Sequence, residues 1–332
     1  MARSRTRRII PVVAAVAAAL SLALAGCSAP ADASSDGAIT IEHTFGKSVI
    51  PETPKRVVTI GWGSADAAIA LGVIPVAIPF QSYGGDKNGV LPWIAEALKK
   101  DDAKTPTILP DSGDDPPYKE IAAAKPDVIL AVLSGITKEQ YDLLSDIAPV
   151  VAYPGEAWAT PWREVIDIVG KALNREDAAA KLQKSIDSKI SAAAAEHPEF
   201  AGKTLAAVSD SGGTFYVYKD EDPRVEFMLD LGFVSAPAVN TLDTDESTFY
   251  FTLSYEKLDQ LDADVVVSYA ATQDEQDAFL NSSYAQLLPA VKNGTVAAVT
   301  GTEFVASVSP PTALSLTWGL NDLVAKLAEA TK

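Results

Sequence analysis

Cysteine and histidine are scarce in this chain. Its 332 residues include one cysteine, Cys27, and two histidines, His43 and His197. A single cysteine permits no intrachain disulfide, so the fold must be stabilised by its core, which a chain of about 300 residues is long enough to build. Two distant histidines do not supply the ligand cluster of a zinc or manganese site.

Other signatures of chemistry are also missing. The motif "DSGG" (210–213) resembles a serine protease nucleophile, but no suitable histidine base accompanies it. The three close carboxylates of "DSGDDPP" (111–117) lack the spacing of a calcium-binding EF-hand, which predicts a solvated loop. No GxxxxGK phosphate loop is present, so any ATP hydrolysis must come from another polypeptide. We therefore expect no catalytic residues, no directly bound metal and no cofactor.

Basic residues are outnumbered by acidic ones. The chain has 27 lysines and arginines against 44 aspartates and glutamates, giving a net charge of −17. This balance argues against nucleic acid or an anionic bilayer surface as a partner. Beyond the N-terminal region no apolar run is long enough to cross a membrane.

The N-terminal region does not read as globular sequence. It has four arginines, no acidic residue, and then the apolar run "IIPVVAAVAAALSLALAG" before Cys27. This is the pattern of a secretory signal peptide over 1–26. Its end, "LAGC", resembles a bacterial lipobox, which predicts that Cys27 is a lipid anchor followed by a flexible tether over 27–38. An uncleaved membrane helix, or a secretory signal with an incidental thiol, is the alternative; the export route stays open.

The mature chain alternates short strands with helices. The stretch "RVVTIGWGSADAAIALGVIPVAI" predicts a strand at 57–60, a helix near 65–71 and a strand at 76–78. The same rhythm returns in "EIAAAKPDVILAV" and "SYEKLDQLDADVVVSY". Strands that alternate with helices indicate parallel sheets covered on both faces, which is α/β architecture.

One segment lacks any strand signal. Residues 175–200 contain about 20 residues of alanine-rich helical sequence, a span of roughly 30 Å, ended by Pro198. Between two α/β halves, at 39–174 and 201–332, such a helix would serve as a rigid connecting strut. The alternative is an ordinary surface helix within one domain.

Five phrases in order resemble a known family. They are "IEHTFGKSVIPETPKRVVTIGWGSADAAIALGVIPVAI" (41–78), "YKEIAAAKPDVILA" (118–131), "WREVIDIVGKALN" (162–174), "SYEKLDQLDADVVV" (254–267) and "PPTALSLTWGLNDLVAKL" (310–327). With the lipobox, they resemble the substrate-binding lipoproteins of bacterial ABC importers for iron-siderophores, a family that includes haem and cobalamin binders. The resemblance implies two α/β lobes joined by one helix, a ligand cleft between them and little hinge closure.

The resemblance also implies a location, a ligand and partner proteins. We expect a monomer that is anchored by lipid on the extracytoplasmic face of the bacterial cell membrane. It would bind a ferric siderophore and pass it to a permease coupled to an ATPase, without chemistry of its own. Haem or cobalamin binding on the same scaffold, or a non-transport surface co-receptor, is the alternative.

Candidate ligand residues lie on loops, because loops after the carboxyl ends of parallel strands build the ligand sites of such sheets. Aromatic rings there would give contact area to an organic chelate. Each aromatic residue has packing as its alternative role, and Arg224 has pairing with its acidic neighbours in "KDEDPRVE". The candidates are Trp62, Tyr83, Trp158, Tyr216, Tyr218, Arg224 and Ser307.

Two glutamates are candidates for docking to the permease. The resemblance implies one exposed glutamate on each lobe, and Glu256 in "LSYEKLDQL" occupies the expected place in the second. In the first lobe Lys119 stands at the expected position and Glu120 follows it. Glu120, Asp114 or Asp115 would then make the contact, unless these are ordinary solvated carboxylates.

The predicted cleft loops favour one kind of siderophore. They contain few lysines and arginines, whereas a ferric tricatecholate carries about three negative charges and would need a basic cluster. We therefore expect a neutral or cationic ferric hydroxamate.

Overall fold

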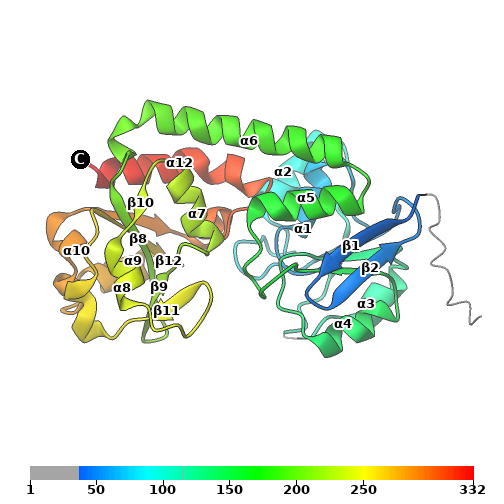
Figure 1. The fold of residues 1–332 in the computed structure, drawn as a ribbon, viewed down its shortest axis with the longest axis horizontal. Coiled ribbons are helices and arrows are strands. Elements are labelled where there is room, and N and C mark those ends of the chain that lie inside the picture. Colours follow the sequence, from blue (N-terminus) through cyan, green and yellow to red (C-terminus); the bar gives the residue numbers. More distant parts are fainter. Residues whose placement is uncertain (1–36, 114) are drawn as a thin grey trace, which may run out of the picture. The chain divides into compact units, whose positions relative to one another are not determined.

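The computed structural model describes residues 37–113 and 115–332 (Figure 1). The predicted signal peptide, Cys27 and all but the last two residues of the predicted tether fall outside this range, as does Asp114. Among the helices of the described ranges, none combines the length and apolarity that crossing a membrane requires.

The first lobe contains a hairpin and a parallel sheet. Strands β1 (Ile39–His43) and β2 (Gly46–Ile50) pair antiparallel, with Ile39 opposite Ile50. The sheet has the order β5-β4-β3-β6-β7, and all of its pairings are parallel. Its strands are β3 (Val57–Thr59), β4 (Ala77–Pro79), β5 (Thr107–Leu109), β6 (Val128–Ala131) and β7 (Val150–Ala152).

Largely apolar runs of sequence form the buried strands of this sheet. Every residue of β3, β6 and β7 is buried, as expected for strands with both faces covered. The accompanying helices are α1 (Ser64–Ala70), α2 (Pro92–Lys100), α3 (Tyr118–Ala123), α4 (Lys138–Ser145) and α5 (Trp162–Ala172). The predicted alternation of helices with parallel strands is therefore confirmed, with boundaries shifted by about one residue.

The long helix α6 (Glu176–Glu196) lies between the two sheets in the chain, and the 3-10 helix η1 (Pro198–Phe200) follows it. Helix α6 packs against α5 towards one end and against α12 and α7 towards the other (Figure 1). Gly170 of α5 permits the close approach, since a Cβ there would lie 2.6 Å from the Cβ of Ala179. Ile186 and Ile190 fix the buried face of α6.

The second lobe has a mixed sheet of order β11-β9-β8-β12-β13, with β10 also paired to β8. Strands β8 (Thr204–Ser211) and β9 (Thr214–Tyr218) form a hairpin whose two-residue turn, Gly212 and Gly213, has φ of 58° and 77°. The other strands are β10 (Val234–Ser235), β11 (Tyr250–Thr252), β12 (Val265–Ala270) and β13 (Val296–Thr300). Strands β8, β10, β12 and β13 are parallel, whereas β9 and β11 add an antiparallel edge.

Helices surround this second sheet. They are α7 (Pro223–Asp230), α8 (Pro237–Leu242), α9 (Gln273–Leu280), α10 (Pro289–Asn293), α11 (Thr302–Val308) and α12 (Ser315–Ala330), with 3-10 helices η2 (Tyr255–Gln260) and η3 (Ala285–Leu287). The last part of the chain returns to the first lobe, because Ala306, Leu314 and Trp318 pack into the cluster formed around α1 and α2. Packing at this point therefore crosses the boundary that the sequence placed between the lobes.

Candidate ligand-binding site

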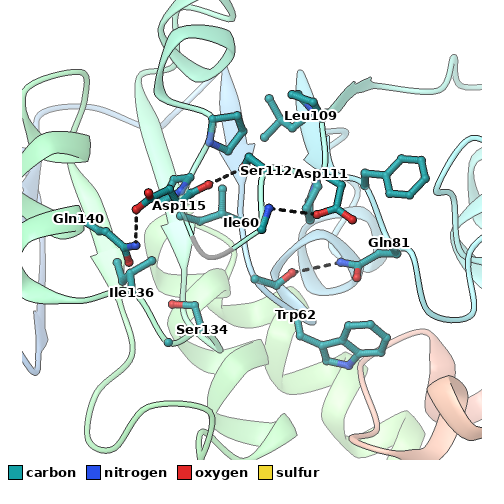
Figure 2. A pocket seen from close by; sticks show the side chains of 18 of the residues that line it. Ile60, Trp62, Gln81, Leu109, Asp111, Ser112, Asp115, Ser134, Ile136 and Gln140 are labelled. Carbon is teal, nitrogen blue, oxygen red and sulfur yellow. Dashed lines mark hydrogen bonds between the residues drawn. The ribbon is translucent and has the colours of Figure 1, made fainter.

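The first cavity lies at the carboxyl ends of the parallel strands in the first lobe (Figure 2). It has a volume of about 500 Å³ and is lined by residues that follow β3, β4, β5 and β6. Ile60, Gln81, Leu109 and Ser134 mark these four strand ends. Ligand sites of open parallel sheets form at this edge, so the cavity lies where the topology predicts one.

Trp62 forms one wall of this cavity. The preceding residue, Gly61, has φ of 75°, and a Cβ there would lie 2.5 Å from the carbonyl oxygen of Leu133. Gln81 also donates its amide to the Gly61 carbonyl oxygen over 3.3 Å. The indole N–H of Trp62 donates to the carbonyl oxygen of Pro310 over 3.0 Å. The polar edge of Trp62 is therefore already bonded, while the residue packs against the core and lines the cavity.

Trp158 lines the same cavity but is 48% exposed. Its φ of 62° is rare for a non-glycine residue, and its backbone N–H donates to the carbonyl oxygen of Ser134 over 3.1 Å. The indole lies against Gly135, where a Cβ would come within 2.1 Å of the indole nitrogen. The loop thus holds a large apolar ring partly in solvent at the edge of the cavity.

Residues 111–113 and 115–117 are more than parts of a solvated loop, because they line the first cavity. Asp115 accepts from the side-chain amide of Gln140 over 3.1 Å, and Asp111 accepts from the backbone N–H of Gly113 over 3.3 Å (Figure 2). Of the described residues that line this cavity, none is lysine, arginine or histidine. The cavity therefore has an acidic side and no basic one.

A second cavity of about 410 Å³ lies between the lobes. Most of its lining comes from the carboxyl ends of β8 and β12, and Tyr83, from the loop after β4, closes it from the first lobe. Tyr83 is 41% exposed. Tyr218 and Tyr269 also line the cavity, with ring centroids 6.1 Å apart in a T-shaped contact. Aromatic residues from both lobes therefore face this space.

Arg224 packs against the ring of Tyr218, which lines this cavity. Its guanidinium carbon lies 3.9 Å from the centroid of the Tyr218 ring, and its Nε donates to the buried carboxylate of Asp222 over 2.7 Å. Arg224 is thus paired with an acidic neighbour and does not line either cavity. Burial raises the pKa of Tyr218, which keeps the phenol protonated at neutral pH.

Two other candidate ligand residues lie away from both cavities. Tyr216 of β9 makes a T-shaped contact with Tyr250, with ring centroids 5.4 Å apart. Ser307 is fully buried in α11, where its hydroxyl donates to the carbonyl oxygen of Phe304 over 2.7 Å. A Cβ on Gly319 of α12 would lie 2.2 Å from that hydroxyl oxygen. The side chain of Ser307 therefore packs between two helices and, unlike the expectation for a ligand residue, lines neither cavity.

The sequence interpretation missed Asp210. This residue, at the end of β8, lines the second cavity and accepts hydrogen bonds from the hydroxyls of Tyr255, over 2.6 Å, and Tyr284, over 2.8 Å. Glu275 lines the same cavity. The available signal was a polar strand end followed by a Gly-Gly turn, which the "DSGG" resemblance obscured.

The docking candidates are exposed. Glu120 lies in the first turn of α3 and Glu256 in the first turn of η2. Lys119 is exposed beside Glu120, whereas Asp115 lines the first cavity. Across residues 37–113 and 115–332, no three His, Cys, Asp or Glu side chains gather in a way that would hold a metal ion.

Comparison with known proteins agrees with this architecture. Residues 57–301 match the family model described as periplasmic binding protein. The chain is 30% identical over 280 residues to the probable siderophore-binding lipoprotein YfiY of Bacillus subtilis, covering 80% of this chain and 82% of the relative.

Two solved structures extend the similarity to the fold. One is the iron uptake ABC transporter substrate-binding protein PiaA of Streptococcus pneumoniae in complex with ferrichrome, with a TM-score of 0.79 and 35% identity over 88% of this chain and 98% of that one. The other is SirA of Staphylococcus aureus with staphyloferrin B, with a TM-score of 0.69 and 26% identity over 87% and 98%. The chain thus has the two-lobe α/β fold and belongs to the periplasmic binding protein family.

Proposed function

We propose that this protein is an extracytoplasmic solute-binding protein that captures a ferric siderophore and delivers it to the permease of an ABC importer. The observation that carries the proposal is the pair of cavities at the carboxyl ends of both sheets, bordered by the exposed rings of Trp158 and Tyr83. Exposed aromatic rings on a preformed concave surface suit a large, partly apolar chelate. The similarity to PiaA, solved with ferrichrome, supports the same cargo class.

The ligand in this proposal is a hydroxamate complex. Among the residues that the structure describes, the lining of the two cavities includes Asp111, Asp115, Asp210 and Glu275, but no lysine or arginine. A ferric tricatecholate, with about three negative charges, would be repelled by such a lining, whereas ferric hydroxamates are neutral or cationic. Trp62, Trp158, Tyr83 and Tyr218 make the contacts, and Arg224 acts by supporting the Tyr218 ring.

A fluorescence titration tests the cargo. Purified protein is titrated with ferrioxamine B, a ferric tricatecholate, ferric citrate, haem and cobalamin, with iron-free controls and absorbance corrections. We expect saturable quenching by the hydroxamate, lost in Trp158→Ala. The matched control is Trp318→Phe, because Trp318 lines neither cavity. Saturation by the tricatecholate alone would contradict the hydroxamate assignment, and saturation by haem or cobalamin alone would replace the cargo.

The membrane anchor in this proposal is lipid on Cys27. The support is the "LAGC" sequence behind an arginine-rich apolar leader. Expression in a bacterial host with radiolabelled palmitate should label the wild type and leave Cys27→Ala unlabelled and released from membranes. Equal labelling of both proteins would contradict the anchor.

Delivery in this proposal uses Glu256 of η2 and Glu120 of α3, which are exposed on different lobes. Carboxylates on the rim of an interface set orientation through pairing with basic side chains of the partner. Charge reversal at Glu256 should abolish uptake of iron while leaving ligand affinity unchanged, and reversal at Glu120 tests the first lobe separately. Undiminished uptake in both variants would contradict this docking surface.

A further inference from the structure

We propose, building on the proposed function, that this site selects ferric hydroxamates carrying a positive charge, with Asp210 and Glu275 as the residues that set this preference. The ligand class is a tris-hydroxamate complex with a pendant ammonium group. Neutral complexes of the same size would bind the same surface more weakly.

The carboxylate of Asp210 is held in place at the cavity wall. Tyr255 donates to one of its oxygens over 2.6 Å and Tyr284 to the other over 2.8 Å. The two tyrosine rings pack together with centroids 4.3 Å apart, so the donors are themselves fixed. Asp210 therefore presents an oriented negative charge to the second cavity and does not need to be ordered by the ligand.

Glu275 adds a second fixed charge on the same cavity. One of its carboxylate oxygens accepts the backbone N–H of Ala271 over 3.0 Å and that of Thr272 over 3.2 Å. Its field reaches the opposite lobe, because burial first and then the negative charge of Glu275 raise the pKa of Tyr83. The second cavity is thus negative on the side that faces Tyr83.

The other groups around this cavity do not cancel that charge. The aromatic residues Tyr83, Tyr218 and Tyr269 line it, and aromatic faces attract cations. Arg224 lies against the Tyr218 ring and is paired with Asp222. The described lining of the first cavity contributes Asp111 and Asp115 and no basic residue. Fixed carboxylates, aromatic residues and the lack of a lining cation together favour a positive ligand.

Two ligands that differ in one charge test the effect of ligand charge on binding. Ferrioxamine B carries one ammonium group, and its N-acetylated form keeps the same iron chelate without that charge. Binding of both is measured by fluorescence titration at low salt and at about 1 M salt. We expect acetylation to weaken wild-type binding about tenfold at low salt, and the ratio to approach one at high salt.

Substitutions of Asp210 and Glu275 test whether these two residues cause the charge preference. Asp210→Asn and Glu275→Gln should each weaken ferrioxamine B about threefold and leave the acetylated form unchanged, the size expected for one solvent-accessible ion pair. The control is Asp322→Asn on α12, which removes one exposed charge outside both cavities. Circular dichroism melting checks that each variant is folded.

The outcomes separate this inference from the proposed function. Equal affinity of the wild type for the two ligands would overturn the charge preference while leaving siderophore binding standing. A preference that stays at its full wild-type size in both Asp210→Asn and Glu275→Gln would overturn the role of these residues. Binding of neither ligand would overturn the hydroxamate assignment, and this inference with it.

Discussion

Thr312 donates its hydroxyl hydrogen to the carboxylate of Asp66 over 2.5 Å, although the two residues are 246 positions apart in the chain. The indole of Trp93 donates to the same oxygen over 2.6 Å. Asp66 lies on α1, and Thr312 lies between α11 and α12, so the bond joins the last part of the chain to the first lobe. Two positions before Thr312, the carbonyl oxygen of Pro310 accepts from Trp62, which lines the first cavity.

Stability should depend on pH through Asp66. Burial raises its pKa from the ordinary 3.8 to about 6, despite the hydrogen bonds from Thr312 and Trp93. Between these two values the folded chain binds more protons than the unfolded chain, so the free energy of unfolding falls as the pH rises from about 4 to about 6. The loss from this group is of the order of 2–3 kcal/mol.

Urea denaturation of the wild type and Asp66→Asn over this range measures the effect. As the pH rises from about 4 to about 6, the free energy of unfolding of the wild type should fall by about 2–3 kcal/mol relative to that of Asp66→Asn. Parallel pH profiles for the two proteins would show that Asp66 does not titrate in this way.

Thr312→Val should weaken the junction. The substitution removes the donor to Asp66 and also the acceptor for the backbone N–H of Ser315, which Thr312 holds over 3.1 Å. Loss of buried hydrogen bonds of this kind costs about 1–3 kcal/mol of the free energy of unfolding. The control is Thr317→Val, an exposed threonine in the first turn of α12. Equal losses in the two variants in urea denaturation would contradict the account.

Part of this architecture was open to prediction from sequence. Apolar runs such as "VVTI" and "DVILAV" report burial on both faces, so the α/β class and most strand positions follow from local pattern. Loops that follow such strands could be located in the same way, and Trp62, Tyr83 and Trp158 do line cavities.

Pairings between distant segments were not open to prediction. Ser307 follows a strand as a ligand residue would, but its environment is set by Gly319 on another helix. Asp210 owes its orientation to Tyr255 and Tyr284, which lie 45 and 74 positions away. A single sequence carries no local signal for either contact. The roles of Glu120 and Glu256 stay predictions for a different reason, because they concern contacts with another molecule.

Gly61→Ala should damage the first cavity. The residue has φ of 75°, and an added Cβ would meet the Leu133 carbonyl oxygen at 2.5 Å. Backbone strain and the contact together should cost about 1–3 kcal/mol of the free energy of unfolding and displace Trp62. Gly72→Ala separates the two causes, because Gly72 has φ of 78° and a Cβ added there would meet nothing within 4 Å. We expect weaker ligand binding only in Gly61→Ala; an equal effect of both substitutions would refute the role of this close contact.

Arg163→Ala should loosen the packing of three helices. Arg163 of α5 contacts Asp187 of α6 over 2.7 Å, and Asp230 and Glu226 of α7 over 2.7 Å and 3.1 Å. Because its side chain is 30% exposed, we discount the charge contribution and expect a loss of about 1–2 kcal/mol in the free energy of unfolding, smaller at high salt. Lys138→Ala, which breaks an exposed pair with Asp142, should cost less than about 0.5 kcal/mol. A loss at Arg163 that does not exceed the loss at Lys138 would contradict the prediction.

The most direct test of the proposed function is the position of iron in a crystal of the protein grown with ferrioxamine B. An anomalous difference map at the iron absorption edge locates the metal by its own scattering, independently of the lighter atoms around it. The account predicts one strong peak in the space bordered by Trp158, Tyr83 and Tyr218. A peak elsewhere on the protein, or none in crystals that contain the bound chelate, would contradict the assignment of this site.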